Sequence, residues 1–331
     1  MQSLQKTWTS DFSSILQARP QGHVLAVCLH PALDVTIYTS GDKELSRRED
    51  LGGKAINLAR MLHALGAKVT LLAPNDYAGQ TGALLKGCSF EAELIPTHLS
   101  LRTNYKHIDT CGALREQNSA AGTLSPQEYE QLFHRIIDNC RTQKFSHVAL
   151  CGSFPQGVEK GVYKSLIEQL HAQDISCLTD ASGEALSLAV QAKPLLIKPN
   201  IQEFCDLFAQ DISMWKTQNE AEAAMLAAYS RTGVEMLCSM DKRGAIYACR
   251  DGIYTVQCRE VTHVAGFAGA GDTMLASFTY ARYLCGASVE HSLRFATAAA
   301  TAKVRLPANT LPSPDQIFAE WAYTSVRKGM V

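Results

Sequence analysis

The sequence predicts an α/β protein with three layers, in which helices cover both faces of a largely parallel, Rossmann-like sheet and a small β-sheet lies beside it. Short apolar runs rich in β-branched residues alternate with stretches of helical period along most of the chain. That alternation is typical of parallel sheets, whose strands are joined by helical crossovers. Two more polar segments, 35–48 and 99–114, interrupt it and predict the small β-sheet, which we call the lid.

The expected elements follow in order. We predict strands at 23–29, 68–73, 147–151, 175–179, 194–198, 234–239, 245–249 and 254–256. We predict helices at 56–65, 129–140, 162–173 and 220–230, and a largely helical region from Thr273 onward. Gly66 follows the first helix and can end it, because glycine adopts the left-handed conformation of a helix C-cap readily. Residues 1–22 are interpreted as an N-terminal extension and residues 23–331 as one domain that includes the lid.

Composition excludes several classes of protein. The chain has 331 residues, 46% of them hydrophobic, which is enough for a large core. Its formal net charge is -1 and it lacks long basic runs, so we expect neither nucleic acid nor a membrane as partner. The 11 Cys form no CxxC pair and the 10 His no HExxH, which favours reduced thiols over disulfides or a metal cluster. Without an apparent signal peptide or membrane span, we expect a cytoplasmic location.

A glycine-rich segment from Gly266 to Thr273 leads into an apolar helical stretch. Gly269 and Gly271, with Ala270 between them, let successive backbone N–H groups point into one space, and the helix start adds positive potential. Such an anion hole suits a phosphoryl group in transit, and Asp272 beside it can accept a proton from an attacking hydroxyl. The plainer interpretation is a glycine-rich turn with an acid near a helix N-terminus.

A second motif, Gly52-Gly53-Lys54-Ala55-Ile56-Asn57, leads into the first predicted helix. Paired glycines let a ligand approach backbone N–H groups closely. Lys54 can meet a phosphate as a point charge, and Asn57 can hydrogen-bond a sugar hydroxyl. The alternative is an ordinary loop-to-helix turn with a solvated lysine.

Two further segments carry polar residues at regular spacing. Asn200 and Glu203 follow a predicted strand and share one face of a helical turn, where their oxygens can hold Mg²⁺, usually through water. A helix start with an N-terminal acid explains the same pair without a metal. Arg102, Asn104 and Lys106 share one face of a predicted lid strand and suit a substrate phosphate, although edge strands often carry lysine for other reasons.

Seven motifs in order resemble the phosphofructokinase-B branch of the ribokinase superfamily, and they cover most of the chain from about Val24. Three join those above: His30-Pro31-Ala32-Leu33-Asp34, the segment Cys151-Gly152-Ser153-Phe154-Pro155-Gln156-Gly157, and the segment Asp180-Ala181-Ser182-Gly183-Glu184-Ala185-Leu186. The first and the last look most like 1-phosphofructokinases and tagatose-6-phosphate kinases.

The resemblance implies a ribokinase-like fold and an ATP-dependent kinase that transfers the γ-phosphate to a hydroxyl of a ketohexose phosphate. For the acceptor it implies that Asp34 and Asn57 hold hydroxyls beside Gly52 and Gly53, and that Lys54 and Arg102 hold the substrate's phosphate, helped by Lys106 and Ser153. For ATP it implies a site lined by Lys198, Ser239, Gly244, Gly269 and Gly271, with Asn200 and Glu203 organising Mg²⁺. Asp272 would be the base, and the backbone of Gly269, Ala270 and Gly271 the anion hole.

The same resemblance implies ATP and Mg²⁺ as cofactors, leaves K⁺ open, and implies a homodimer through the lid. The chain also departs from the family pattern. Ala55 and His30 stand where Gly and Asn are usual, Phe267 stands where Ser or Thr is usual, and Asp241-Lys242 replaces Gly-Ala. None of these changes removes a catalytic group, but together they leave the identity of the sugar and the affinity for nucleotide open.

Three alternatives compete with this interpretation. A kinase of an unphosphorylated sugar or nucleoside would need no cationic pair in its sugar pocket, so Lys54 and Arg102 argue against it. A catalytically weak sugar-phosphate sensor on the same fold is left open by the departures, but Asp272 argues against it. A dinucleotide-dependent oxidoreductase ranks low, because no GxGxxG follows the first strand.

Overall fold

The computed structural model describes residues 8–41, 43–109, 114–120, 122–211, 213, 215, 217–262, 264–266, 268–307 and 310–329. The chain divides into two compact units, which we call the N-terminal and the C-terminal unit. The N-terminal unit comprises His23–Arg60 and Val69–Leu195. The C-terminal unit comprises Met1–Gly22, Met61–Lys68 and Leu196–Val331. Within the described ranges, no helix is long and apolar enough to cross a membrane.

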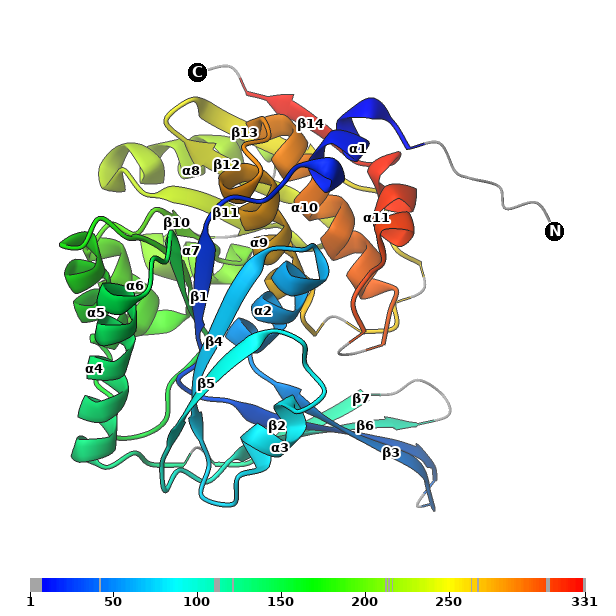
Figure 1. Cartoon of the computed structure of the whole chain (residues 1–331). Helices are drawn as coiled ribbons and strands as arrows, with labels where there is room; N and C mark the ends of the chain where they lie inside the picture. Colours follow the sequence, from blue (N-terminus) through cyan, green and yellow to red (C-terminus); the bar gives the residue numbers. More distant parts are fainter. Residues whose placement is uncertain are drawn as a thin grey trace. The chain divides into compact units, whose positions relative to one another are not determined.

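The N-terminal unit is built on a sheet with the strand order β9-β8-β1-β4-β5. Its strands are β1 (His23–Val27), β4 (Lys68–Asn75), β5 (Glu91–Pro96), β8 (His147–Cys151) and β9 (Ser176–Asp180). β1 pairs in parallel with β8, β8 with β9, and β4 with β5. Every residue of β1 is buried, as expected of a central strand covered on both faces. The helices of this unit are α3 (Gln80–Leu85), α4 (Pro126–Thr142), α5 (Val162–His171) and α6 (Gly183–Gln191), together with the first part of α2 (Lys54–Ala64), whose last four residues belong to the C-terminal unit (Figure 1).

The lid is a separate sheet in the same unit, with the order β3-β2-β6-β7. Its strands are β2 (Ala32–Ser40), β3 (Lys43–Gly52), β6 (Arg102–Asp109) and β7 (Leu114–Asn118). β2 pairs antiparallel with β3 and parallel with β6. The two polar segments of the sequence therefore do form a small sheet, although residues 42 and 110–113 lie outside the described part of the chain.

The C-terminal unit has a sheet of mixed direction, with the order β14-β13-β12-β11-β10. Its strands are β10 (Leu196–Ile197), β11 (Glu235–Ser239), β12 (Ala245–Cys249), β13 (Gly252–Gln257) and β14 (Ser325–Lys328). β10 and β11 are parallel, whereas β11 to β14 pair antiparallel. The helices are α1 (Ser10–Gln17), α7 (Ile201–Phe208), α8 (Gln218–Thr232), α9 (Ala270–Phe278), α10 (Val289–Val304) and α11 (Pro314–Trp321), and a π-helical segment, Thr279–Leu284, continues α9.

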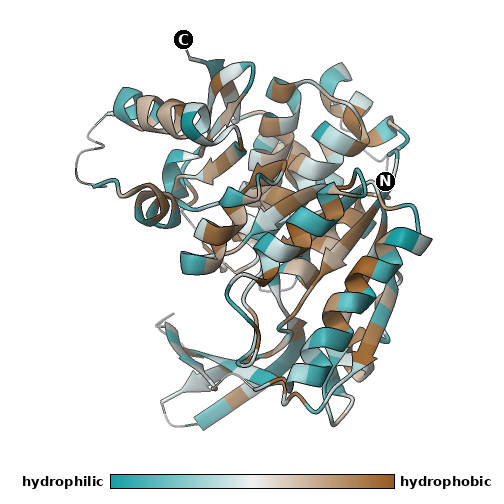
Figure 2. Ribbon diagram, turned by 90° about the vertical axis from the view of Figure 1, so that its left-hand side faces the viewer, coloured by the Kyte–Doolittle hydropathy of each residue, from teal (hydrophilic) through white to brown (hydrophobic). Residues whose placement is uncertain are grey.

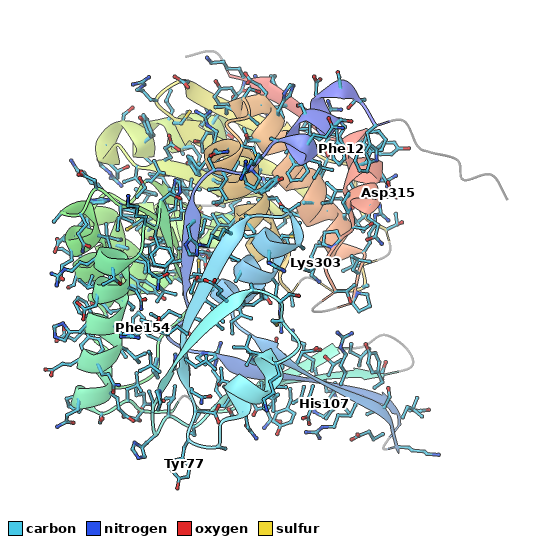
Figure 3. All side chains as sticks on the ribbon, viewed as in Figure 1. Phe12, Tyr77, His107, Phe154, Lys303 and Asp315 are labelled. Atoms are coloured by element: carbon cyan, nitrogen blue, oxygen red, sulfur yellow. The ribbon has the colours of Figure 1, made fainter. Side chains whose placement is uncertain are left out.

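The residues interpreted as an N-terminal extension contain helix α1, which belongs to the C-terminal unit. Phe12, labelled in Figure 3, is fully buried. Its ring packs against those of Phe295, Phe318 and Trp321. Figure 2 shows interior strands coloured mainly as hydrophobic and the strands of the lid mainly as hydrophilic, while many helices carry a hydrophilic face, which is the pattern of helices packed on a buried sheet. The final strand β14 lies in the region expected to be largely helical, and its polar residues are mostly exposed at a sheet edge.

Candidate active site

The predicted site residues fall into two groups, one in each unit. The N-terminal unit contains the predicted acceptor-sugar residues, and the C-terminal unit contains the predicted nucleotide, metal and catalytic residues. We describe the two groups separately.

Asp34, one of the two residues predicted to hold sugar hydroxyls, is paired with Asn104. They are register partners in the parallel pair of β2 and β6, and Asn104 Nδ2 donates a hydrogen bond of 2.7 Å to Asp34 Oδ1. Arg102 and Lys106 precede and follow Asn104 by two residues, so they share its face of the sheet. The predicted common face of Arg102, Asn104 and Lys106 is therefore present, and Asp34 lies on it too.

Gly52 leaves room for the carboxylate of Asp34. A Cβ atom at position 52 would lie 2.3 Å from Asp34 Oδ2, far closer than any real contact. Gly52 pairs with Ala32 across β2 and β3, so the close approach follows from the strand register. Gly52, the first glycine of the second motif, is thus needed because a larger residue there would collide with Asp34, which the sequence also identifies as a candidate site residue.

Lys54 makes an ion pair that the sequence analysis did not foresee. Its Nζ lies 2.6 Å from Oδ1 of Asp180, a residue 126 positions later, at the end of β9. The side chain of Asp180 is 1% exposed and that of Lys54 is 37% exposed. Asp180 was part of a recognised motif but was given no role. Asn57 lies in the first turn of α2, and its backbone N–H donates to the carbonyl of Gly53 at 3.0 Å.

His30 lies beside Ser153 and Arg102. Its Nδ1 is 3.2 Å from Ser153 Oγ, and its side chain is buried while Ser153 is exposed. Burial and then the positive charge of Arg102 lower the pKa of His30 to about 4, so its imidazole is neutral at physiological pH. In the sequence His30 stands out only as a departure from the family pattern, whereas the structure places it beside Ser153 and Arg102, two of the predicted acceptor residues.

The second group centres on the start of α9. Gly269 is the N-cap residue with a φ of 80°, a left-handed conformation that favours glycine, and the backbone of Ala270 and Gly271 forms the first turn. Asp272 lies in that turn and is 7% exposed. The free N–H groups of a helix start and the local dipole favour an anion at this point. The geometry therefore fits the predicted anion hole with a carboxylate beside it, and the neighbouring Phe267 lies outside the described residues.

Lys198 lies against this anion hole. A Cβ atom at Gly271 would come within 3.1 Å of Lys198 Nζ, and the lysine itself is 4% exposed. The glycine thus leaves space between its backbone and the ammonium group. A buried cation next to helix-start N–H groups concentrates positive charge where a phosphate would sit.

A cavity of about 390 Å³ lies next to the same turn. Its lining includes the predicted residues Ser239, Gly244, Ala270 and Gly271. Gly244 closes the tight turn before β12 with a φ of 91°, and a Cβ atom there would lie 2.0 Å from the carbonyl oxygen of Val256. The volume is in the usual range for a small-molecule pocket.

Much of the cavity wall is apolar and was not predicted. It is supplied by the segment before the glycine-rich turn, by α9 and by α10, through Val261, Val264, Met274, Ala300 and Val304. Polar groups enter from Asp241, Lys242 and Arg259, and Lys242 forms an exposed ion pair with Glu260. An apolar wall with a polar, cationic end suits a molecule with a flat base and a phosphate chain.

Asn200 and Glu203 form a capping box at the start of α7. Asn200 Oδ1 accepts from the Glu203 N–H at 2.8 Å, and Glu203 Oε2 accepts from the Asn200 N–H at 2.9 Å. The two side chains thus cap the start of α7, which is the role expected if the pair belongs to a helix start without a metal. Each oxygen keeps a further lone pair, so binding of Mg²⁺ through water stays a prediction. Within the described ranges, no group of three or more His, Cys, Asp or Glu residues could hold a metal ion.

Comparison with solved structures identifies the fold. Phosphofructokinase-2 from Escherichia coli, in a structure with potassium, matches with a TM-score of 0.82 and 23% identity, over 92% of this chain and 99% of that one. A ribokinase from Arabidopsis thaliana, with ribose and ATP, matches with a TM-score of 0.68 and 16% identity, over 91% and 98%. These likenesses confirm the predicted ribokinase-like fold, with a large, mostly parallel sheet and a small separate one.

Comparison of sequences identifies the family. The 1-phosphofructokinase of Haemophilus influenzae is 28% identical over 266 residues, which is 77% of this chain and 82% of that protein. The ATP-dependent 6-phosphofructokinase isozyme 2 of Escherichia coli is 27% identical over 284 residues, or 83% and 88%. The family described as pfkB family carbohydrate kinase matches residues 26–316. The predicted enzyme class, a phosphotransferase with an alcohol group as acceptor, is thereby confirmed: the chain belongs to the pfkB family of carbohydrate kinases.

Proposed function

We propose that this kinase uses ATP to phosphorylate a free hydroxyl of a ketohexose phosphate. The observation that carries the proposal is the common face of Arg102, Asn104 and Asp34. The guanidinium of Arg102 can bind a phosphate, and the hydrogen-bonded pair of Asp34 and Asn104 can bind hydroxyls. Residues two apart on a strand are separated by roughly 6.6 Å, a spacing comparable with the length of a hexose phosphate.

The relatives support the same substrate class. Those described above are named for phosphofructokinase activity, and one structure of the Escherichia coli phosphofructokinase-2 is a complex with fructose-6-phosphate. For this chain, the proposed substrate class of ketohexose phosphates rests on the cationic and proposed hydroxyl-binding residues of the lid and on the family. Fructose-1-phosphate, fructose-6-phosphate and tagatose-6-phosphate are the candidate acceptors.

In the proposed reaction, Asp272 accepts the proton of the acceptor hydroxyl while the oxygen of that hydroxyl bonds to the γ-phosphorus. The bond between that phosphorus and the bridging oxygen breaks, and ADP leaves. The N–H groups of Gly269, Ala270 and Gly271 and the ammonium of Lys198 stabilise the charge on the transferred group. A positioned general base contributes about 10²–10⁴-fold to the rate in typical cases.

ATP is proposed to occupy the cavity beside α9, with its base against the apolar wall and its phosphates toward Gly271. Mg²⁺, when bound, would supply positive charge that offsets the charge of the phosphate chain. Asn200 and Glu203 would hold it through water, because each already accepts a backbone N–H with one oxygen. A rate comparison in K⁺ and Na⁺ salts decides whether K⁺ is also required.

A homodimer through the lid and a cytoplasmic location complete the proposal. β3 is an edge strand of the lid, and Leu45 on it is 55% exposed. Most of the described cysteines are buried, as reduced thiols usually are, which fits a reducing compartment. A molecular mass measured by light scattering tests the dimer: Leu45→Arg should yield monomers, and an unchanged dimer would exclude this surface.

A substrate panel tests the proposed function. ATP consumption is measured with the three candidate ketohexose phosphates, the matching free sugars and a set of nucleosides. We expect the preferred phosphorylated sugar to exceed its free counterpart by at least about 10-fold in kcat/KM, because Arg102 contributes a charge-assisted contact. Preference for a free sugar or a nucleoside would favour the first alternative, and tight binding of a sugar phosphate without turnover would favour the sensor.

A further inference from the structure

Three buried polar atoms near the start of the lid have no hydrogen-bond partner among the residues that the structure describes. They are Nε2 of His30, Nε of Arg102 and Oδ1 of Asn104. A buried polar atom left unpaired is destabilising, because it has lost its hydrogen bonds to water, so folded proteins keep few of them. Three in one region indicate a place where a ligand completes the hydrogen bonding.

The three residues are brought close by the fold of the N-terminal unit. His30 follows β1, and Ser153, whose Oγ lies 3.2 Å from its Nδ1, follows the neighbouring parallel strand β8. The carboxyl ends of neighbouring parallel strands meet at one edge of a sheet, where ligands of α/β proteins bind. Arg102 is the first residue of β6 and pairs with Ala32, which follows His30 by two residues in the chain. Two nitrogen-bearing side chains thus enter the site from different elements.

The imidazole of His30 supplies a donor without supplying charge. Burial and Arg102 keep the pKa of His30 near 4, so the ring carries a single proton at neutral pH. When Nδ1 accepts from the hydroxyl of Ser153, that proton resides on Nε2. Arg102 on β6 is the charged group whose effect on the pKa of His30 is resolved.

We propose that His30 donates its Nε2–H to the phosphate already carried by the acceptor sugar, next to Arg102, and so helps the enzyme select phosphorylated sugars. The inference rests on the proposed function and adds to it a specificity residue. The related family motif has Asn at this position, whose amide ends nearer the backbone than an imidazole does. A donor that reaches further favours a substrate whose phosphate lies correspondingly farther from β1.

Three variants test the role of His30 by calorimetric binding of the preferred sugar phosphate, its free sugar and ATP. His30→Leu removes the donor and keeps the volume, and His30→Gln restores an N–H donor at about the reach of the imidazole Nε2. His147→Leu is the matched control, because His147 lies in the same unit with its Nδ1 3.0 Å from Ser146 Oγ. We expect His30→Leu to weaken sugar-phosphate binding about 10-fold or more, the effect of losing a hydrogen bond to a charged group.

The affinities for ATP and for the free sugar should change less than about twofold in His30→Leu, because neither ligand is proposed to make the hydrogen bond that is lost. His30→Gln should recover most of the loss, and His147→Leu should show none. Equal weakening of all three ligands, or none, would overturn the inference while leaving the proposed function intact. If the wild type binds no sugar phosphate at all, the proposed function fails first, and the role of His30 fails with it.

A measurement on the wild type makes the test independent of whether His30→Leu folds. In protein with ¹⁵N-labelled histidine, the Nε2–H resonance of His30, assigned with His30→Gln, should shift when sugar phosphate is added. Free sugar should leave it in place. Equal shifts with both ligands, or none with either, would contradict a contact with the phosphate.

Discussion

A methyl group added at Gly52 should disable sugar binding while leaving nucleotide binding intact. In Gly52→Ala the new Cβ would lie 2.3 Å from Oδ2 and 2.5 Å from Cγ of Asp34. Real Cβ atoms stay beyond 3.0 Å, so the carboxylate must turn away. That movement breaks the 2.7 Å hydrogen bond from Asn104 and displaces the group proposed to hold a sugar hydroxyl.

The expected loss of affinity follows from the proposed hydrogen bond between the sugar hydroxyl and the Asp34 carboxylate, which the displaced carboxylate can no longer make. A hydrogen bond to a charged group contributes roughly 1.5–3 kcal/mol, which corresponds to about 10–100-fold in affinity for the sugar phosphate. Crowding at a packed site also costs about 1–3 kcal/mol of stability. The KM for ATP should stay within about twofold of the wild-type value, because no contact to ATP is lost. A twofold change corresponds to less free energy than one neutral hydrogen bond contributes.

Gly161→Ala is the matched control for this experiment. Gly161 lies in the same unit, its φ is -81°, and a Cβ atom there meets nothing within 4 Å. Steady-state kinetics with varied sugar phosphate and varied ATP, together with Tm, should separate the two variants. A Gly52→Ala enzyme that stays folded and binds sugar phosphate as the wild type does would refute the role given to Asp34.

Three further predictions concern the lid and acid stability. Arg102→Ala should raise the KM for a phosphorylated sugar about 10–100-fold and leave that for ATP nearly unchanged; an equal effect with free sugar would indicate a structural role. Amide hydrogen exchange in 35–41, 43–48 and 99–109 should slow with sugar phosphate but not with free sugar, because charge-assisted contacts form only with the phosphate; unchanged exchange at saturation would exclude lid closure. Glu128 is buried, which raises its pKa, but hydrogen bonds from the His98 and Ser125 backbone outweigh this and lower the pKa to about 2. Its contribution to stability is therefore complete above about pH 4.5 and is lost as the pH falls through about 2, so Glu128→Gln should flatten acid unfolding curves in that window; curves that match the wild type would contradict it.

The sequence was sufficient for the parts of the fold with strong periodicity. β1, β8, β11 and β12 lie within two residues of their predicted bounds, because each is a short apolar run. β5 (Glu91–Pro96) was missed, since it carries two exposed or half-exposed glutamates at a sheet edge. The helix in 10–17 was missed because its apolar residues pack on helices nearly 300 positions later, a contact that no local pattern reveals.

The candidate site shows the same division. Residue types in short motifs identified Asp34, Gly52 and Asp272, and the spacing Asn200-x-x-Glu203 could have been interpreted at once as a capping box. The partner of Lys54 could not be found this way, because Asp180 lies 126 residues away and the pair exists only through the sheet. The apolar cavity wall was missed for the same reason, since its residues come from separate segments without a motif.

Asp272→Asn tests the central claim most directly. The amide keeps the size of the carboxylate but cannot accept a proton at neutral pH, so turnover with the preferred sugar phosphate should fall about 10²–10⁴-fold. Calorimetry should show that the variant still binds the sugar phosphate with wild-type affinity. Near-normal turnover by a folded Asp272→Asn enzyme would contradict the assignment of Asp272 as the base and the phosphoryl-transfer mechanism built on it.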